Sequence, residues 1–359
     1  MADGTRAFLA LGGAALVALL TVPLARRLAI ATDFLDRPRD YKTHGGAIPY
    51  LGGLGVMVAF GIVAGLLGDA YADIGTVMAL AFGLCLMGSI DDRWTLGPTL
   101  RFALQLGAAA LLWADGIRWE PFDLVLLDLP LTLAWVVGLT NAFNLLDNID
   151  GAAGATGAVS AAGIGAIALH EGSGDLAAVA FALSGACAAF LLFNLTDRFK
   201  VFLGDGGSMP LGFLVAALAM LLPTGLGNVA LLAAVPLAGV AIFDTSLVVL
   251  SRRRRGVGIL TGGRDHSTHR LLRPLGTPRR VAVVLALAQG ALGALAFVMT
   301  DLSEGAVLLV SGAYVALGVY LLSVFEGPAL APDAPALGPA PADTSRSRAA
   351  TPSVGHVGR

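Results

Sequence analysis

Long apolar stretches, separated by short polar segments, follow one another along most of the chain. A helix needs roughly 20 apolar residues to cross the hydrocarbon core of a bilayer, and eleven stretches come close to this length. Several are short or rich in Gly and Ala, which is typical of helices packed inside a membrane bundle. The pattern therefore predicts an all-α fold, a polytopic membrane helix bundle. The predicted spans are approximately residues 7–25, 50–68, 74–90, 99–114, 129–146, 152–170, 176–194, 207–223, 228–250, 281–300 and 305–325.

Composition supports this class of protein. Hydrophobic residues make up 56% of the chain, charged residues only 13%, and the mean hydropathy is +0.79, whereas a soluble domain carries about 25% charged residues. Only Arg6 precedes the first apolar stretch, and no clear small-residue cleavage site follows it, so we expect a retained helix rather than a removed signal peptide. Cys85 and Cys187 both lie in apolar stretches and are interpreted as buried thiols without a disulfide.

The basic residues predict how the chain is oriented in the membrane. Cytoplasmic segments of membrane proteins carry an excess of Lys and Arg. If the N-terminus lies outside, all of the 23 Lys and Arg residues except Arg6 and Arg118 fall on the inside. We therefore expect about 11 transmembrane helices in residues 1–326, with the N-terminus outside and the C-terminus inside. Residues 327–359 are rich in Pro, Ala, Gly and Ser, which predicts a disordered cytoplasmic tail.

Carboxylates gather at the inner ends of the predicted helices. Asp91, Asp92, Asp147, Asp150 and Asp205 each lie at the end of an apolar stretch, and the predicted topology places all of them on the inner side. A charge near lipid is costly unless it has a partner or a function. Mg²⁺ takes hard oxygen ligands, commonly one or two carboxylates together with water and substrate phosphates. The five carboxylates therefore suggest a divalent cation and a phosphate-bearing substrate.

Two inner segments add amides and glycines to these acids. Asn141, Asn144 and Asp147 are spaced by three along one helical face, where polar groups in an apolar helix need shared partners. These partners could be a substrate or metal, or simply an interhelical polar network. Residues 204–208 open an apolar helix whose backbone N–H groups favour an anion, and Asp205 could hold a cation beside it. The alternative for Asp205 is a simple helix cap.

Two further inner segments carry basic and histidine side chains. Lys42 and His44 lie two residues apart in an extended segment, where Lys42 could neutralise a phosphate or serve only as an inside-positive residue. His266 and His269 lie three apart in a basic loop, with Arg270 adjacent. This loop fits a nucleotide or lipid phosphate. A zinc site formed with Asp265 is conceivable, but no further ligand is evident and Mg²⁺ fits the other segments better.

One acid lies inside an apolar stretch rather than at its end. Asp244 follows residues 228–243 and, as an intramembrane acid, is a functional candidate by default. Its structural alternative is a partner on a neighbouring helix, either a hydroxyl or an arginine one to two turns further along the chain.

Taken together and in order, these segments resemble the polyprenyl-phosphate N-acetylhexosamine-1-phosphate transferases of glycosyltransferase family 4, from about Asp33 to Gly276. Each motif alone is weak, but five in register are specific. The matching positions are Lys42, His44, Pro49, Gly52, Gly53, Asp91, Asp92, Asn141, Asn144, Asp147, Asp150, Gly151, Asn194, Phe202 to Ser208, Asp244, Thr245 and Asp265 to Leu271.

The resemblance implies transfer of N-acetylhexosamine 1-phosphate, foremost the N-acetylglucosamine form, from a UDP-sugar to undecaprenyl or decaprenyl phosphate, with release of UMP. It implies Mg²⁺, with Mn²⁺ as the alternative ion, on Asp205, Asp92 and Asn144. The implied catalytic residues are Asp91, Asp92, Asp147, Asp150, His266 and His269. The implied substrate-binding residues are Lys42, His44, Asn141, Asn144, Asn194, Phe202, Asp244 and Arg270.

The same resemblance implies a multi-pass protein of the bacterial cytoplasmic membrane, with its active site facing the cytoplasm. The expected partners are the UDP-sugar, the polyprenyl phosphate and the bilayer. No nucleic acid partner is expected, and a homodimer is implied by the resemblance alone.

Three departures from the family pattern bear on the substrate. Asn148 stands where many members have Gly, and Thr196 to Phe199 stand where many have a Pro-Ala pair. His266 and His269 do not form the triple-His run, followed by Phe-Glu, of the phospho-MurNAc-pentapeptide translocase. That translocase remains an alternative with the same chemistry. An ion-coupled secondary transporter is the alternative of another class, but it would place acids near the bilayer midplane in repeat-related pairs, and no repeat is visible.

Overall fold

The computed structural model describes residues 2–37, 46–67, 72–223, 227–259 and 263–330, and the account below concerns these residues. They form helices and one short β-hairpin. The helices are α1 (Asp3–Ala31), α2 (Gly52–Leu67), α3 (Ala72–Trp94), α4 (Pro98–Ala114), α5 (Val125–Leu146), α6 (Ala152–His170), α7 (Gly174–Asn194), α8 (Asp205–Met220), α9 (Asn228–Leu237), α10 (Gly239–Arg255), α11 (Ser267–Leu275), α12 (Pro278–Thr300) and α13 (Glu304–Phe325). The hairpin pairs β1 (Leu35–Asp36) with β2 (Ile48–Pro49).

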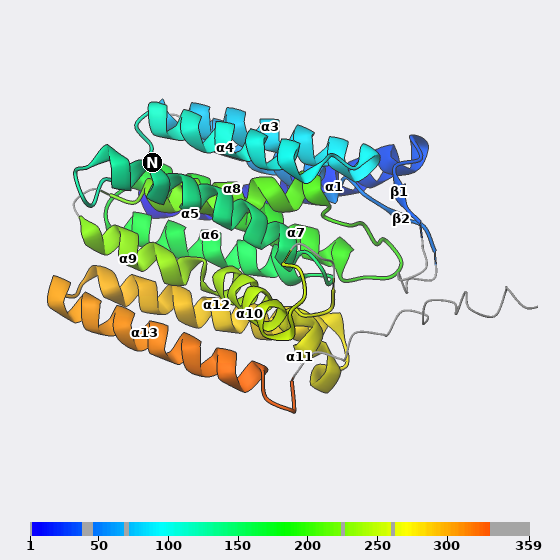
Figure 1. Cartoon of the computed structure of the whole chain (residues 1–359). Helices are drawn as coiled ribbons and strands as arrows, with labels where there is room; N and C mark the ends of the chain where they lie inside the picture. The colour runs from blue at the N-terminus through cyan, green and yellow to red at the C-terminus, as the bar shows by residue number, and fades with distance from the viewer. Residues whose placement is uncertain (1, 38–45, 68–71, 224–226, 260–262, 331–359) are drawn as a thin grey trace, which may run out of the picture.

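The long helices lie side by side in one bundle, which confirms the predicted all-α membrane fold (Figure 1). Each of the eleven apolar stretches contains a helix. Within the described ranges, seven helices are long and apolar enough to cross a membrane, or up to eight if a bent pair counts as one span. Helices α2 and α8 are shorter apolar helices of 16 residues each. The count of about eleven spans and the outside N-terminus stay predictions.

The structure differs from the sequence prediction in two elements. The stretch 228–250 is not one straight helix, because α9 and α10 meet at a bend of 69°. Helix α11 was not predicted, because it has only nine residues and many of them are polar. It gathers with the β1–β2 hairpin and the end of α10 at the end of the bundle that lies away from the N-terminus (Figure 1). The expected tail from residue 327 lies mostly outside the described residues.

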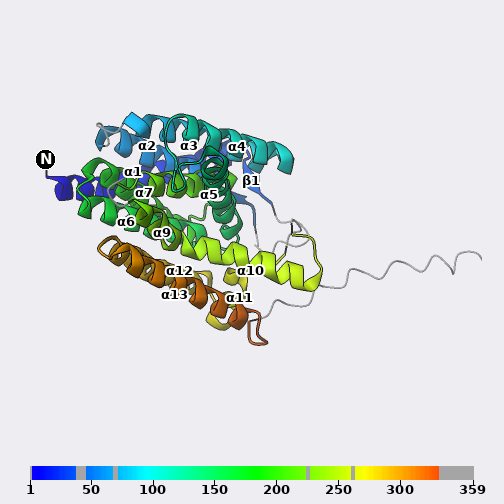
Figure 2. The ribbon, with the colours of Figure 1, turned by 60° about the vertical axis from the view of Figure 1, so that its left-hand side comes forward.

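The helices differ in how deeply they are buried, and this difference follows their side chains. Helices α6 and α7, rich in Gly and Ala, are the most buried of the candidate spans and pack against each other in the centre. Helix α13 is at the edge of the bundle (Figure 2) and exposes large apolar side chains such as Leu308 and Leu309. An apolar exterior of this kind suits contact with lipid.

Backbone hydrogen bonds position the segment that leads into α8. The first N–H groups of a helix have no partner within the helix. In α2 the N–H groups of Gly52 and Gly53 donate to the carbonyls of Phe202 and Leu203, each at 3.0 Å. The N–H of Phe202 in turn donates to the carbonyl of Pro49 at 2.9 Å. The start of α8 is therefore fixed against both β2 and α2.

Glycines allow α2 and α8 to approach closely at this point. A Cβ added to Gly53 would lie 2.2 Å from the Cα of Gly207, so the two backbones are in direct contact. We expect Gly53→Ala to separate these helices and to destabilise the protein, because inserted groups in a packed interior cost about 1–3 kcal/mol.

The measurement is the thermal unfolding midpoint of the purified protein in detergent. Gly65→Ala is the matched control, because Gly65 lies on the same helix with no other atom within 4 Å of its added Cβ. An unchanged midpoint for Gly53→Ala would show that the helix contact is not as tight as described.

Candidate active site

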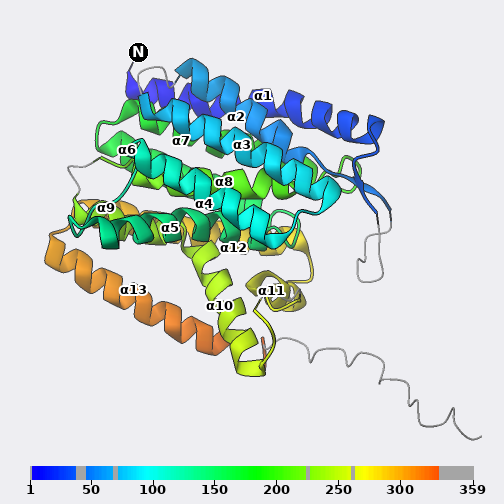
Figure 3. The same ribbon diagram turned by 45° about the horizontal axis from the view of Figure 1, so that its top comes forward.

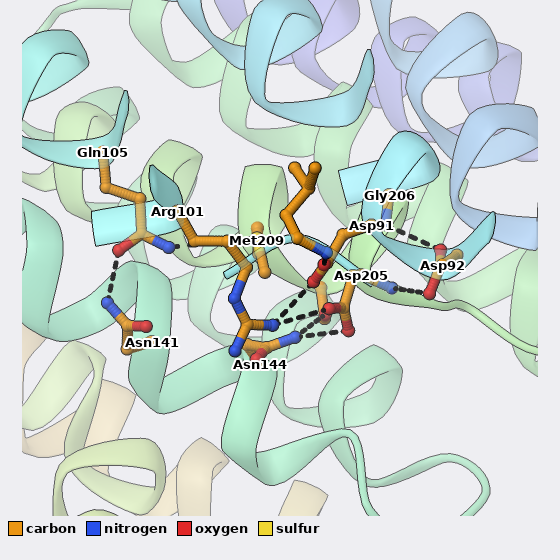
Figure 4. Close-up of polar contacts among 11 residues, drawn as sticks. Asp91, Asp92, Arg101, Gln105, Asn141, Asn144, Asp205, Gly206 and Met209 are labelled. Atoms are coloured by element: carbon orange, nitrogen blue, oxygen red, sulfur yellow. Dashed lines mark hydrogen bonds and ion pairs between the residues drawn. The ribbon is translucent and has the colours of Figure 1, made fainter. Parts of the chain in front are cut away.

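The C-terminal ends of α3 and α5 meet the start of α8, and the predicted acids Asp91, Asp92 and Asp205 come together there (Figure 4). Asp92 from α3 accepts hydrogen bonds from the backbone N–H groups of Asp205, at 3.0 Å, and Gly206, at 3.2 Å. It therefore caps α8 from another helix and satisfies donors that α8 cannot satisfy itself. This capping places the Asp92 carboxylate beside Asp205.

Asp205 is reached by two side chains from other helices. The Nδ2 of Asn144 on α5 donates to Asp205 at 2.7 Å and contacts the Oγ of Ser208 at 3.0 Å. The guanidinium of Arg101 on α4 reaches Asp205 at 3.3 Å. The structure thus brings together Asp92, Asn144 and Asp205, the three predicted metal ligands.

Asp91 points away from Asp92 and has different partners. It is buried and accepts from the backbone N–H of Leu96 at 2.5 Å and from Arg101 at 2.6 Å. A single nitrogen of Arg101 thus lies between Asp91 and Asp205 (Figure 4). From the sequence, Arg101 contributed only to the predicted sidedness. A basic residue in the first turn of the helix that follows the paired aspartates is the sequence feature that could have identified Arg101 as a site residue.

Two further acids border the same turn. Burial and the nearby charges of Asp205, Asp92 and Asp150 raise the pKa of Asp147 well above its usual range, although the N–H of Gly204 donates to its carboxylate. Asp150 instead forms an ion pair with Lys200, with 2.6 Å between Nζ and the carboxylate. The carboxylates around residues 204–206 are therefore close enough to repel one another.

These side chains suit one kind of metal ion better than another. Among the described residues, no group of three His, Cys, Asp or Glu side chains forms a ready-made metal site, which gives no support to zinc on Asp265, His266 and His269. Mg²⁺ commonly uses one or two carboxylates and completes its shell with water and phosphate. Asp92 and Asp205 retain acceptor capacity, because an ionised carboxylate offers about four lone-pair sites. The oxygen donors here fit Mg²⁺.

A pair of hydrogen-bonded amides, Gln105 and Asn141, extends these polar contacts along α4 and α5. Gln105 lies one turn after Arg101 and is buried. Its Oε1 accepts from the Nδ2 of Asn141 at 2.5 Å, and its Nε2 contacts the sulfur of Met209 at 3.9 Å (Figure 4). The predicted residue Asn141 thus contacts α4 as well as its own helix. Gln105 was missed, because an isolated glutamine in an apolar stretch gives no functional signal.

Asp244 pairs with residues 265–271, which contain His266 and His269 and are called the histidine segment below. It is fully buried and accepts from the Nδ1 of His266 at 2.8 Å. It also accepts from the backbone N–H and the hydroxyl of Ser267, at 2.7 and 2.6 Å. Its partners are therefore in α11 and the residue before it, not the later arginine of its own helix that was considered from the sequence.

His269 faces His266, with 6.2 Å between the ring centroids. Burial, together with the neighbouring His266 and Arg264, lowers the pKa of His269 to about 4. A histidine is largely protonated only below its pKa, so His269 is neutral near pH 7 and would offer a ligand hydrogen bonds rather than charge.

Arg270 and Asp265 anchor α11. They do not face the acid cluster, by which we mean Asp91, Asp92, Asp147 and Asp205. Arg270 is fully buried and donates to the carbonyl of Phe325 at 2.7 Å and to Glu326 at 2.9 Å. Burial raises the pKa of Asp265, but the hydrogen bonds and charges of Arg252 and Arg255 outweigh it and hold that pKa below its usual range. The contacts of Arg270 indicate a link between α11 and the end of α13, and its role toward phosphate stays a prediction.

Asn194 and Phe202 hold the segment before α8. Asn194 accepts from the N–H of Gly151 at 2.6 Å and donates to the carbonyl of Val201 at 3.0 Å. The ring of Phe202 lies 6.0 Å from that of Tyr50, measured between centroids. These contacts position the loop, and a direct contact of either side chain with substrate stays a prediction.

A side-chain hydrogen bond links the histidine segment to the acid cluster. The hydroxyl of Thr268 on α11 donates to the Oδ1 of Asn148 at 2.5 Å. Asn148 follows Asp147 directly, so α11 lies beside the turn between α5 and α6. The remaining predicted residues, Lys42 and His44, lie outside the described residues.

Comparison with known proteins places the chain among related sequences. The family model described as glycosyl transferase family 4 matches residues 74–223. The chain is 30% identical over 287 residues to the probable undecaprenyl-phosphate N-acetylglucosaminyl 1-phosphate transferase of Bacillus subtilis, covering 75% of this chain and 79% of that protein.

Two further relatives show the same level of similarity. The undecaprenyl-phosphate alpha-N-acetylglucosaminyl 1-phosphate transferase of Escherichia coli is 30% identical over 297 residues, or 76% of this chain and 78% of that protein. The decaprenyl-phosphate N-acetylglucosaminephosphotransferase of Mycolicibacterium smegmatis is 30% identical over 358 residues, or 87% of each chain. With matches of this identity and coverage in addition to the family model, the chain belongs to glycosyl transferase family 4.

Proposed function

We propose that the protein transfers N-acetylglucosamine 1-phosphate from UDP-N-acetylglucosamine to undecaprenyl or decaprenyl phosphate. The products are the polyprenyl-diphosphate sugar and UMP, the first membrane step of a cell-envelope glycan. The observation that carries this proposal is the convergence of Asp92, Asn144 and Asp205 at the start of α8, at the end of an apolar bundle. The names of the three relatives support the sugar and the lipid.

The reaction joins two anions, so their repulsion is the main obstacle. An oxygen of the lipid phosphate attacks the β-phosphorus of the nucleotide sugar, and the bond from this phosphorus to the bridging oxygen breaks as UMP leaves. Arg101 offers positive charge beside Asp91 and Asp205. Mg²⁺, with Mn²⁺ as the alternative, would be held by Asp205, Asp92 and Asn144 and would supply charge for the pyrophosphate and the transition state.

The partners of Asp91 bear on the question of a general base. The second phosphate pKa is near 6, so the lipid phosphate arrives largely deprotonated and needs little help from a base. Asp91 already accepts from Arg101 and from the N–H of Leu96. Its arrangement supports a role in holding Arg101 rather than in taking a proton.

An apolar groove offers a place for the lipid tail. It lies between α5 and α10, has a volume of about 470 Å³, and is lined by Trp135, Leu139, Ile242 and Val249, with Arg253 also in its wall. Helix α5 carries Asn144 as well as this groove, so a tail bound there would lead toward the acid cluster. The nucleotide phosphates would contact His266 and His269, with His266 held by Asp244.

We place the protein in the bacterial cytoplasmic membrane with the site facing the cytoplasm. The support is the distribution of basic residues, since Lys200, Arg252 and Arg255 lie at the same end of the bundle as the acid cluster and α11. A homodimer stays a prediction.

Purified protein given UDP-N-acetylglucosamine and undecaprenyl phosphate should release UMP and form a lipid-linked sugar. We expect removal of divalent ions with EDTA to stop the reaction and added Mg²⁺ to restore it. UDP-MurNAc-pentapeptide should be a poor donor in the same assay, because the histidine segment departs from the translocase pattern. Absence of UMP release with either donor would argue against the proposal, and preference for the pentapeptide donor would assign the other substrate.

The acid cluster predicts the effect of removing one charge at a time. Asp205→Asn and Asp92→Asn should each lower kcat by at least about a hundredfold, the scale for losing one electrostatic contact to the transition state. Asp115→Asn makes the same change at an exposed position just after α4 and serves as the control. Size-exclusion profiles and unfolding midpoints should show that each variant is folded. Near-normal turnover in either variant would remove that residue from the metal site.

The position of Arg101 between two carboxylates predicts that its substitution by Lys and by Met will have different effects on kcat/KM. Because one of its nitrogens reaches both carboxylates, the compact ammonium of Arg101→Lys can take its place, and we expect kcat/KM within about tenfold of wild type. Arg101→Met leaves Asp91 buried without its cation and should lower kcat/KM by more than about a hundredfold. Equal rates for the lysine and methionine variants would contradict a role for the positive charge.

A further inference from the structure

The break between α9 and α10 leaves backbone groups without helical partners in the middle of an apolar bundle. The chain turns by 69° at Ala238, between Leu237 and Gly239. In lipid, every backbone N–H and C=O needs a partner within the protein. Pro236 contributes to the break because proline ends or kinks a helix. It does not supply partners for the groups that the break exposes.

One side chain of another helix supplies them. Gln289 of α12 is fully buried. Its Nε2 donates to the carbonyl of Pro236 at 3.0 Å and to that of Leu237 at 2.9 Å. Its Oε1 accepts from the N–H of Val240 at 3.2 Å. The amide therefore contacts both sides of the break, using its donors for α9 and its acceptor for α10.

The position of Gln289 is itself fixed by close packing. One turn further along α12, a Cβ added to Gly293 would lie 3.9 Å from the Cα of Gly163 on α6. A Cβ added to Gly163 would lie 2.7 Å from a methyl group of Leu237, the last residue of α9. Helices α6, α9 and α12 thus meet beside the bend, and the amide has a firm support.

The direction of α10 after the bend determines two parts of the site. Figure 3 shows α10 leaving the direction of the other long helices. The groove lies between α5 and residues 242–253 of this diverging helix. Asp244, which holds His266 and Ser267, follows the bend by little more than one turn.

We propose that Gln289 is a positioning residue that sets the angle between α9 and α10, and through it the lipid groove and the place of the histidine segment. The identity of the groove's occupant rests on the proposed function, whereas the angle does not. The side-chain amide of Gln289 hydrogen-bonds to the backbone groups at the break, and Gln289 is not among the residues that line the groove.

The angle can be measured without any activity. Spin labels at Leu192 on α7 and Arg254 on α10, both exposed, would report it in a protein whose Cys85 and Cys187 are replaced by Ala. Helix α10 has 17 residues, so a change of about 15° at the bend moves its far end by roughly 6 Å. We expect Gln289→Met, similar in size but without the amide, to shift or broaden the distance distribution by several ångströms. Leu285→Met, one turn earlier and also buried, should leave it unchanged.

The same variants separate positioning from a loss of folding. Gln289→Met should raise the KM for undecaprenyl phosphate at least about tenfold, the scale of one buried hydrogen bond left unmade, with a smaller change in kcat. Gln289→Glu keeps the acceptor and, when protonated, one donor. Burial favours its neutral form, so its distances and KM should stay close to wild type near pH 7 and move toward those of Gln289→Met as the pH rises.

Wild-type distances and lipid KM in Gln289→Met would overturn the inference. If Gln289→Met does not fold, a distance distribution of Gln289→Glu that does not depend on pH would overturn it instead. A wild-type protein without transferase activity would refute the proposed function, while the distance measurement would still decide the role of Gln289.

Discussion

The site depends on how the first backbone N–H groups of α8 find acceptors. A helix that begins inside a membrane protein exposes donors that neither water nor lipid can satisfy well. Here the carboxylate of Asp92 accepts from two of them. This hydrogen bonding fixes α3 against α8 and holds Asp92 next to Asp205, where the two negative charges repel. A requirement of the backbone thus creates the electrostatic condition in which a cation and phosphate groups become favourable.

Positive charge is unevenly distributed among the acids of the site. Asp91 and Asp205 share Arg101, Asp150 has Lys200, and Asp265 has two arginines of α10. The pKa of Asp147, in contrast, is raised by burial and by the neighbouring acids. Because Asp91 and Asp205 share the single charge of Arg101, and Asp92 and Asp147 lie beside Asp205, negative charge is in excess at this turn rather than at the histidine segment. This supports a divalent cation at the start of α8, whereas His269, whose pKa is lowered, offers hydrogen bonds as a neutral group.

Much of the fold could be predicted from the sequence because apolar length is a local property. All eleven stretches contain helices, and the predicted metal ligands Asp92, Asn144 and Asp205 lie together at the start of α8. Pro236 is a local signal for a break in the stretch 228–250, but the angle at Ala238 also depends on Gln289, about 50 residues away. The same holds for Arg101, whose partner Asp205 is distant in sequence. Arg270 was expected at phosphate by its place in a motif, but its burial against Glu326 depends on the packing of α13.

The contacts of α11 suggest that chemistry and recognition are carried by different parts of the fold. The acid cluster is built from α3, α4, α5 and α8, which pack along the bundle, whereas the histidines depend on Asp244 of the diverging α10. Near the start of α11, two sets of hydrogen bonds add to the anchoring by Arg270, from Asp244 to His266 and Ser267 and from Thr268 to Asn148. The second joins α11 to the turn after Asp147 through a side chain that a glycine at position 148 would lack. Because Leu271, Leu272 and Leu275 pack against the core and Arg270 binds Glu326, a single substitution at Asn148 or Thr268 would change the start of α11 without displacing the whole helix. Differences in sugar preference within this architecture would then arise at Asn148 and the start of α11 without altering Asp92, Asn144 and Asp205 at the start of α8.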